Sequence, residues 1–177
     1  KFLKKLSERT TNELEDITKE IYELAGEEFN ISSPKQLGEV LFDKMKITNK
    51  PKKTKTGQYS TSEEVLNELS SKSDLVKLVL KFRSISKLLN TYINSLPKQL
   101  DKYTNRIHTE YVQTVASTGR LSSINPNLQN IPIRTNRGRE VRKAFIARNK
   151  DYFLMAADYS QIELRIIASL SNEENMM

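Results

Sequence analysis

Hydrophobic residues recur at helical spacing through the first hundred residues of this chain. In residues 2–29 the apolar positions fall three and four residues apart, which predicts one long amphipathic helix. Its core-facing positions are Leu14, Ile17, Ile21 and Leu24. A more regular apolar stripe predicts a second long helix over 73–96, ended or kinked by Pro97. The positions of that stripe are Leu78, Phe82, Ile85, Leu89, Tyr92 and Leu96. Because the two apolar faces match, we expect the helices to pack antiparallel and to bury the second stripe.

Two shorter helices are expected between the long ones. Ser33 is a good N-cap, and Pro34 suits the first position of a helix that ends near Lys46. The buried positions of this helix are expected to be Leu37, Val40 and Leu41. Thr61 and Glu64 have the spacing of a capping box, which predicts a further short helix.

Strand-like patterns appear after residue 104. Residues 107–114 alternate in polarity and are rich in β-branched side chains, which is typical of a strand. Residues 141–148 and 152–157 are predicted to be two further strands, and residues 161–171 a helix. The expected fold class is therefore α+β, with antiparallel strands and a strand-to-helix junction near the C-terminal end.

Composition is consistent with two small sub-domains, a helical one over 1–100 and a mixed one over 101–177. The 177 residues are 29% charged and 37% hydrophobic, as in globular proteins. The absence of cysteine excludes a disulfide framework and a thiolate metal site, and it favours a reducing cytoplasm. The longest apolar run, residues 152–157, is far too short to span a membrane. The first residue is Lys1 and not Met, so we expect a piece of a longer protein.

Charge is spread unevenly along the chain, whose net charge is +7. Residues 1–30 hold five Lys or Arg and eight Asp or Glu, a net charge of −3. Residues 44–143 hold twenty Lys or Arg and seven Asp or Glu, a net charge of +13. A basic middle is typical of a protein with a polyanionic partner, although a solvated basic surface has the same charge. The loop 49–62 contains Lys50, Lys52, Lys53 and Lys55 and is either a phosphate contact or a soluble tip.

An acidic residue stands at the predicted strand-to-helix junction. Asp158 ends the apolar run 152–157, and Glu163 follows in the predicted helix. An exposed carboxylate held between two rigid elements suits Mg²⁺, which prefers oxygen ligands. An Asp in this position is also a common N-cap. Glu163 is either a second metal ligand or a solvated helix acid.

The eight residues Asp158–Arg165, with the sequence DYSQIELR, resemble the first catalytic motif of the DNA polymerase I family, family A. The resemblance runs in family order from about residue 20 to the end of the chain. The other segments that carry it are Ser33–Phe42, Lys52–Gly57, Tyr59–Ser62, Thr118–Ser123, Pro126–Pro132 and Arg134–Thr135. Several motifs in the correct order are more specific than any one of them.

The resemblance implies a thumb followed by a partial palm, corresponding to the two expected sub-domains. The parent enzyme would add deoxynucleotides to a primer 3′ end by a two-metal mechanism. Asp158 and the backbone carbonyl of Tyr159 would be Mg²⁺ ligands, while Gln161 and Glu163 would meet the sugar and exclude a ribose 2′-OH. The implied DNA contacts are Lys52, Lys53, Lys55, Lys87, Thr91, Tyr92, Arg120, Asn127, Gln129 and Arg134.

Some parts of the family pattern are missing from this chain. No His-Asp-Glu tripeptide, which carries the family's second catalytic carboxylate, occurs in it, and the family's nucleotide-binding helix would follow residue 177. We therefore expect the isolated chain to bind primer-template DNA as a monomer but to polymerise nothing and hold no Mg²⁺. The parent enzyme is expected in a bacterial-type cytoplasm, on the nucleoid, with no membrane contact. Local departures from the family occur at Leu89, Val112 and Asn125.

Two alternatives remain open from the sequence. One is a DNA-binding module without chemistry of its own, and the other is a piece of a single-subunit RNA polymerase. Glu163 argues against the second, because an enzyme that uses ribonucleotides should not carry an acidic gate there. His108, the single histidine, is expected to have a structural role, and Arg165 is expected to pair with a carboxylate.

Overall fold

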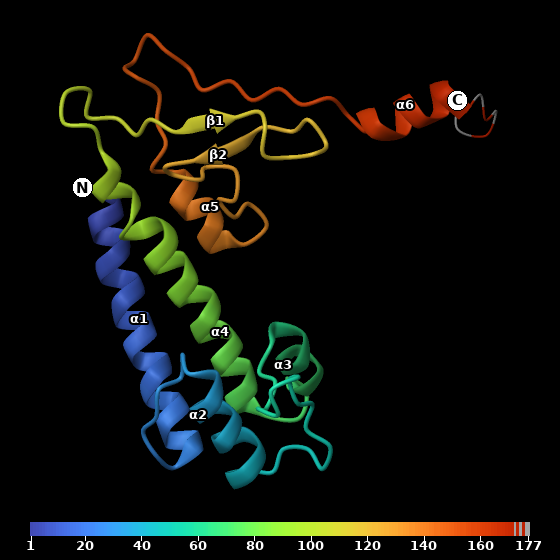
Figure 1. Cartoon of the computed structure of the whole chain (residues 1–177). Helices are drawn as coiled ribbons and strands as arrows, with labels where there is room; N and C mark the ends of the chain where they lie inside the picture. Colours follow the sequence, from blue (N-terminus) through green and yellow to red (C-terminus); the bar gives the residue numbers. More distant parts are fainter. Residues whose placement is uncertain (172, 174, 176–177) are drawn as a thin grey trace. The chain divides into compact units, whose positions relative to one another are not determined.

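The computed structural model describes residues 1–171, 173 and 175, in two compact units, Lys1–Ala144 and Phe145–Met177. Most of the chain is in the first unit, where helices predominate (Figure 1). Its elements are α1 (Phe2–Ala25), α2 (Pro34–Gly38), η1 (Glu39–Lys44), α3 (Glu63–Leu69), α4 (Asp74–Leu88), η2 (Leu89–Ile93), η3 (Leu96–Gln99), β1 (Glu110–Val112), β2 (Ser122–Ile124) and α5 (Asn136–Arg142). Helices together with a small antiparallel sheet confirm the α+β class.

Helix α1 ends earlier than the sequence pattern predicts. Gly26 takes a left-handed conformation with φ +75°, and its N–H donates to the carbonyl of Tyr22. Glycine has no Cβ to oppose this conformation, so it ends the helix before residue 29. Ile17 and Ile21 are buried as predicted, but the prediction for Leu24 is wrong, since it is 48% exposed. At that end of α1 the core is met by Tyr22 and Ala25 instead.

Helix α4 and its π-helical continuation η2 run antiparallel to α1, which confirms the predicted pairing (Figure 1). Near the start of α1, Ser7 donates a hydrogen bond of 2.7 Å to Asn94. Farther along α1, the Glu13 carboxylate lies 3.7 Å from the Lys81 ammonium of α4. Residues that come early in one helix therefore meet residues that come late in the other.

The residues of α4 that are buried lie on different sides of the helix in its first and second halves. Ile85 and Leu89 are buried as predicted, but Leu78 and Phe82 are only partly buried, so that part of the prediction is wrong. In the first half of α4 the fully buried side chains are Leu75, Val76 and Val79. Helix α3 packs on this half, so burial is divided between the sides that face α1 and α3. A truncation of Phe82 should consequently cost less than that of a fully buried aromatic residue.

Helix α2 forms where the sequence predicts it and continues into the π-helical turn η1. The Ser33 side chain accepts a hydrogen bond from the Gln36 N–H, and Pro34 is the first helical residue. The three predicted core positions, Leu37, Val40 and Leu41, are all buried. This segment packs into the same core as α1, α3 and α4.

Helix α3 begins one residue later than a capping box at Thr61 requires. Its N-cap is Ser62, whose Oγ accepts a hydrogen bond of 3.4 Å from the Val65 N–H. Thr61 is buried, and both its hydroxyl and its carbonyl oxygen accept hydrogen bonds from the Arg83 guanidinium. The predicted capping box is therefore wrong, because a tertiary contact engages Thr61.

Strands β1 and β2 form a two-stranded antiparallel sheet within which Tyr111 is opposite Ser123. Strand β1 occupies only the middle of the predicted strand 107–114. The strand predicted over 141–148 is wrong, because Val141 lies in α5 and is fully buried there. Thr135 caps this helix by accepting a 3.1 Å hydrogen bond from the Gly138 N–H.

The second unit contains one helix, α6 (Ile162–Ser171), among the residues that the structure describes. This helix agrees with the predicted range 161–171. The predicted strand over 152–157 is wrong: its residues are exposed and form no ladder with any described residue. A strand requires a partner edge for its backbone groups, and β propensity alone does not provide one. No helix in the described residues has both the length and the apolar composition that crossing a membrane requires.

Candidate nucleic-acid interface

The basic loop of the first unit is folded as a small hairpin over residues 52–60. The Ser60 N–H donates to the Lys52 carbonyl at 2.9 Å, and the Thr54 N–H donates to the Gln58 carbonyl at 2.8 Å. Gly57 closes the turn with φ +81°, a conformation that favours glycine. We call residues 52–60 the basic hairpin.

Tyr59 fixes the base of the basic hairpin on the helices below it. Its ring centroid lies 5.0 Å from that of Phe42, and its hydroxyl donates a hydrogen bond to the Asp43 carboxylate. This hydrogen bond raises the pKa of Tyr59 above its ordinary value. Gly38 passes so close that a Cβ there would lie 2.8 Å from the Tyr59 Cβ. The hairpin is therefore held by packing, although its lysines are exposed.

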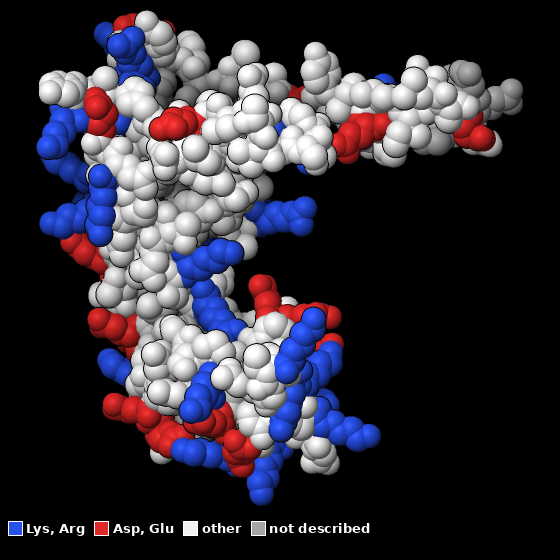
Figure 2. Space-filling model, viewed as in Figure 1, with Lys and Arg blue, Asp and Glu red and all other residues white. Residues whose placement is uncertain are grey.

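The three lysines of the basic hairpin have different surroundings. Lys52 forms a 2.7 Å ion pair with Glu68, which raises the pKa of the lysine, and Lys53 Nζ lies 5.3 Å from the centroid of the Tyr59 ring. Lys55 is exposed at the turn. Figure 2 shows Lys and Arg side chains interspersed with Asp and Glu side chains at this end of the first unit. The hairpin thus presents cationic side chains from a fixed backbone, as a phosphate contact requires.

A second group of predicted contacts lies on the segment between β1 and α5. We call residues 117–134, which include β2, the β2 loop. Its centre is Ser123, which is fully buried and whose Oγ accepts a 3.1 Å hydrogen bond from the Leu128 N–H. The same hydroxyl lies 2.6 Å from Thr109 Oγ1, which also donates to the Pro126 carbonyl at 2.7 Å. These bonds fold the loop back onto the sheet. The sequence placed Ser123 in a family motif and Thr109 in a predicted strand, but it indicated this structural role for neither hydroxyl.

Gln129 and Asn127 hold the β2 loop in shape. The Gln129 amide accepts from the Ser123 N–H at 3.1 Å and donates to the Leu121 carbonyl at 3.0 Å. The Asn127 Oδ1 accepts from the backbone N–H of Gln129 at 3.0 Å and of Asn130 at 3.3 Å. Both side chains are on the surface. Among the described residues, the hydrogen bonds of the Asn127 amide use its oxygen. The N–H groups of its Nδ2 therefore remain available as hydrogen-bond donors to a ligand.

The predicted contacts on α4 and η2 divide into surface and interior positions. Lys87 and Thr91 are exposed and lie four residues apart, hence on one face. Tyr92 is buried, and its hydroxyl donates a hydrogen bond to the carbonyl of Asn130. This bond ties the β2 loop to η2, which gives Tyr92 a positioning role. Arg120 and Arg134 are exposed on the loop.

The candidate metal ligands, Asp158 and the Tyr159 carbonyl, lie in the second unit with the candidate sugar-gate residues Gln161 and Glu163. All four residues are exposed. The Arg165 Nε donates to the Ser160 carbonyl at 3.0 Å, where the sequence predicted a carboxylate partner. A carboxylate and a backbone carbonyl are hard oxygen ligands that suit Mg²⁺. No group of three or more acidic, His or Cys side chains arranged to hold a metal occurs in the described part of the chain. The Asp158 carboxylate and the Tyr159 carbonyl therefore have the chemistry to hold Mg²⁺, but holding two ions would require further ligands.

Comparison with known proteins identifies the family. A family model described as DNA polymerase family A matches residues 1–177. The chain belongs to the family A DNA polymerases. It is 48% identical over 177 residues to DNA polymerase I of Geobacillus stearothermophilus, a match that covers 100% of this chain and 20% of the relative. With DNA polymerase I of Pseudomonas aeruginosa it shares 53% identity over 162 residues, which are 91% of this chain and 18% of that protein.

The structure of this family A chain also matches part of a solved polymerase domain. That solved structure is described as the POL domain of Pol1 from M. smegmatis in complex with DNA primer-template and dNTP. The TM-score is 0.84 at 41% sequence identity, and the match covers 98% of this chain and 30% of that one. The chain spans about a fifth of the length of the curated relatives it matches. Because these relatives are DNA polymerases, they support the DNA polymerase prediction over the RNA polymerase alternative.

Proposed function

We propose that this chain is the thumb and the first part of the palm of a template-dependent DNA polymerase, with the boundary near residue 100. Its task is to hold primer-template DNA while the parent enzyme adds deoxynucleotides to the primer 3′ end. One observation carries the proposal: the basic hairpin and the β2 loop present cationic and amide side chains on backbones fixed by buried contacts. The M. smegmatis polymerase domain, whose fold this chain shares, was solved with primer-template and dNTP.

The basic hairpin and the β2 loop have different roles in this proposal. Lysine side chains contact phosphates without regard to sequence, and so does Arg134. Asn127 and Arg120 donate to minor-groove acceptors, which every Watson–Crick pair offers, so they sense the shape of the pair and not its sequence. Gln129 belongs to the same surface and also keeps the loop in shape. Lys87 and Thr91 extend the contact along α4 and η2.

The chemistry of the parent enzyme is proposed to use Asp158 and the Tyr159 carbonyl as Mg²⁺ ligands. When bound, such ions would supply activation of the attacking oxygen and neutralisation of charge on the leaving group. Asp158 precedes α6 and offers its carboxylate at the surface, and the proposal gives Gln161 and Glu163 the role of meeting the sugar of the nucleotide. We propose a monomer that works on the nucleoid in the bacterial cytoplasm, with deoxynucleoside triphosphates as substrates of the complete enzyme.

The purified 177-residue chain should bind primer-template DNA and extend nothing. Binding requires the first unit, whereas phosphoryl transfer requires fixed positioning by two bridged ions, and Asp158 alone bridges none. Gel-based primer extension with Mg²⁺ and four deoxynucleotides measures the second property, and fluorescence anisotropy measures the first. Extension that depends on Asp158 would show that this chain alone suffices for catalysis, and failure to bind DNA would remove the proposed function.

Neutralising the basic hairpin should flatten the salt dependence of DNA binding. In the variant Lys52→Gln, Lys53→Gln, Lys55→Gln, each phosphate that is no longer bound should reduce the slope of log K against log salt by about 0.9. Anisotropy titrations at several salt concentrations measure this slope. The matched control replaces three exposed lysines of α1, Lys4, Lys5 and Lys19, and should weaken binding less and retain the slope. Equal slopes in the two variants would place the hairpin outside the interface.

In the complete polymerase, Glu163→Ala should relax discrimination against ribonucleotides by about tenfold or more, equivalent to roughly 1.4 kcal/mol. The reason is that an acidic side chain placed against the sugar rejects a 2′-OH, and alanine leaves room for it. The measurement is the ratio of kcat/KM for deoxynucleotide and ribonucleotide. Glu173→Ala is the control, because it removes another exposed acid of the same unit. If Glu163→Ala instead loses metal binding and all turnover while rejecting ribonucleotides, Glu163 is a ligand.

A further inference from the structure

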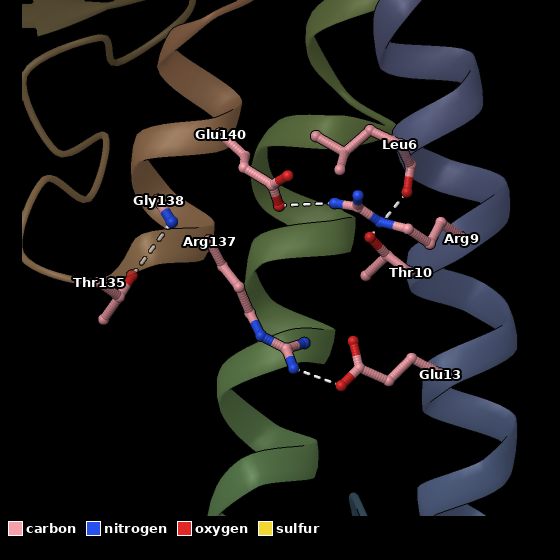
Figure 3. Close-up of polar contacts among 8 residues, drawn as sticks. All are labelled: Leu6, Arg9, Thr10, Glu13, Thr135, Arg137, Gly138 and Glu140. Atoms are coloured by element: carbon pink, nitrogen blue, oxygen red, sulfur yellow. Dashed lines mark hydrogen bonds and ion pairs between the residues drawn. The ribbon is translucent and has the colours of Figure 1, made fainter.

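Helix α5 is joined to α1 by two ion pairs between residues far apart in the sequence (Figure 3). The Arg9 guanidinium of α1 lies 2.6 Å from the Glu140 carboxylate of α5. One turn farther along α1, the Glu13 carboxylate accepts a hydrogen bond from the Arg137 guanidinium of α5. Along the direction of α1, the base Arg9 is followed by the acid Glu13. In the same direction in space, the partners on α5 come in the opposite order of charge, Glu140 first and then Arg137.

This order of charges is satisfied in one register only. A shift of α5 by one turn along α1 would bring Arg9 against Arg137 in one direction and Glu13 against Glu140 in the other. Either shift replaces two attractions by a repulsion. The charges therefore stabilise the observed register and also destabilise the two neighbouring ones.

Glu13 extends this arrangement to a third helix. Its carboxylate also lies 3.7 Å from the Lys81 ammonium of α4. The hydrogen bond from Arg137 lowers the pKa of Glu13, and that from Arg9 lowers the pKa of Glu140. Both acids are therefore ionised at neutral pH. Glu13 and Arg137 are each about one-third exposed, so their attraction is screened less than that of an open surface pair.

Helix α5 is in turn tightly connected to the β2 loop. A Cβ at Gly138 would lie 2.5 Å from the Pro132 Cβ and 2.6 Å from the Pro132 carbonyl oxygen, so the two segments are in direct backbone contact. The Arg139 Nε donates to the Ile133 carbonyl at 3.1 Å. Arg134 lies between these contacts in the sequence. A displacement of α5 along α1 would consequently carry this end of the β2 loop with it.

We propose that Arg9, Glu13, Arg137 and Glu140 form an electrostatic clamp that sets the register of α5 on α1 and thereby positions the β2 loop on DNA. We call these four residues the α1–α5 clamp. They are positioning residues, because they act through the loop and not by touching DNA. The part of the inference that concerns DNA rests on the proposed function, whereas the part that concerns register does not.

The test is a charge-swap cycle in which net charge never changes. One half-swap is Arg9→Glu with Glu13→Arg, the other is Arg137→Glu with Glu140→Arg, and the fourth protein carries all four substitutions. Each half-swap places like charges face to face, and the quadruple variant restores both attractions between α1 and α5. Glu13→Arg also loses the Lys81 ion pair, but it does so equally in the first half-swap and in the quadruple variant, so the comparison of these two isolates the α1–α5 pairs. Constant net charge matters because DNA affinity responds to total charge. A control, Asp74→Lys with Lys77→Glu, exchanges an exposed ion pair within α4.

The register is read directly from a distance between two spin labels. The chain has no cysteine, so Asn12→Cys on α1 and Asn136→Cys on α5, both at exposed positions, provide unique labelling sites. We expect one narrow distance distribution for the parent chain, the control and the quadruple variant, and a shifted or broadened one for each half-swap. Unchanged distances in both half-swaps would overturn the clamp. If a half-swap does not fold, Arg137→Gln and Glu140→Gln are measured in the same way.

DNA binding is measured on the same proteins by anisotropy over a range of salt. Each half-swap should weaken primer-template binding at least about threefold and reduce the salt slope by about 0.9 for each phosphate that the displaced loop no longer reaches, and the quadruple variant should recover both. Changed distances with unchanged affinity and slope would overturn the positioning of the loop. Failure of the parent chain to bind DNA would overturn the proposed function, while the distance measurement would still decide the register.

Discussion

Replacing Asp158 by alanine in the complete polymerase should reduce the rate of nucleotide addition by about a thousandfold or more. A thousandfold corresponds to about 4 kcal/mol of transition-state stabilisation, which is the scale expected for removing a carboxylate that we propose as a metal ligand. Primer-template affinity should remain within about twofold, because the DNA contacts that we propose are in the first unit. Single-turnover primer extension at saturating DNA measures the rate.

The matched control for this substitution is Asp151→Ala. Asp151 is an exposed aspartate of the same unit and precedes the extended run that leads to Asp158. The control should retain its rate, because the charge removed is the same and the position is not a proposed ligand. A rate for Asp158→Ala close to that of Asp151→Ala would remove Asp158 from the metal site.

Ile21→Ala should lower the free energy of unfolding of the first unit by about 2–5 kcal/mol. Ile21 is fully buried in the core that α1 shares with Leu41, Leu66 and Val79, so truncation both loses apolar burial and leaves a cavity. Denaturant unfolding followed by far-UV circular dichroism measures the change. The control is Leu24→Ala on the next turn of α1.

The sequence pattern places Ile21 and Leu24 on the same apolar face, but the structure leaves Leu24 48% exposed. Its truncation should therefore cost about 0.5 kcal/mol or less, as is usual for surface positions. Similar losses from the two variants would mean that the core extends to the last turn of α1, contrary to the burial of these two side chains.

Local sequence signals predicted the helical half of the fold well. The Ser33–Pro34 start and the apolar periodicity of α1 and α4 act within one or two turns, so they can be recognised without knowing the rest of the chain. The antiparallel pairing followed from two matching apolar faces. The capping-box prediction failed at Thr61. Thr61 and Ser62 both suit an N-cap, but the Arg83 guanidinium binds the Thr61 hydroxyl, and Ser62 is the N-cap instead.

The predicted strands were less successful for a physical reason. A strand depends on a partner edge, and residues 152–157 have no such partner in the described part of the chain. Val141 looked like a strand position, but Thr135 caps a helix there and Gly138 packs on Pro132. The contact between Gly138 and Pro132 depends on how the chain turns between these two residues, so the local polarity pattern around Val141 could not indicate it.

The sequence by itself determined the family and the candidate residues, because the motifs around Asp158 and in the β2 loop are contiguous and occur in a specific order. Only the tertiary structure decided what several of those residues do: Tyr92 is an internal tie to Asn130, and Gln129 braces its own loop. The α1–α5 clamp joins residues more than 120 positions apart, as with Arg137 and Glu13. No local pattern marks such a pair, since each residue alone resembles an ordinary solvated charge, and proximity in space gives the pair its effect.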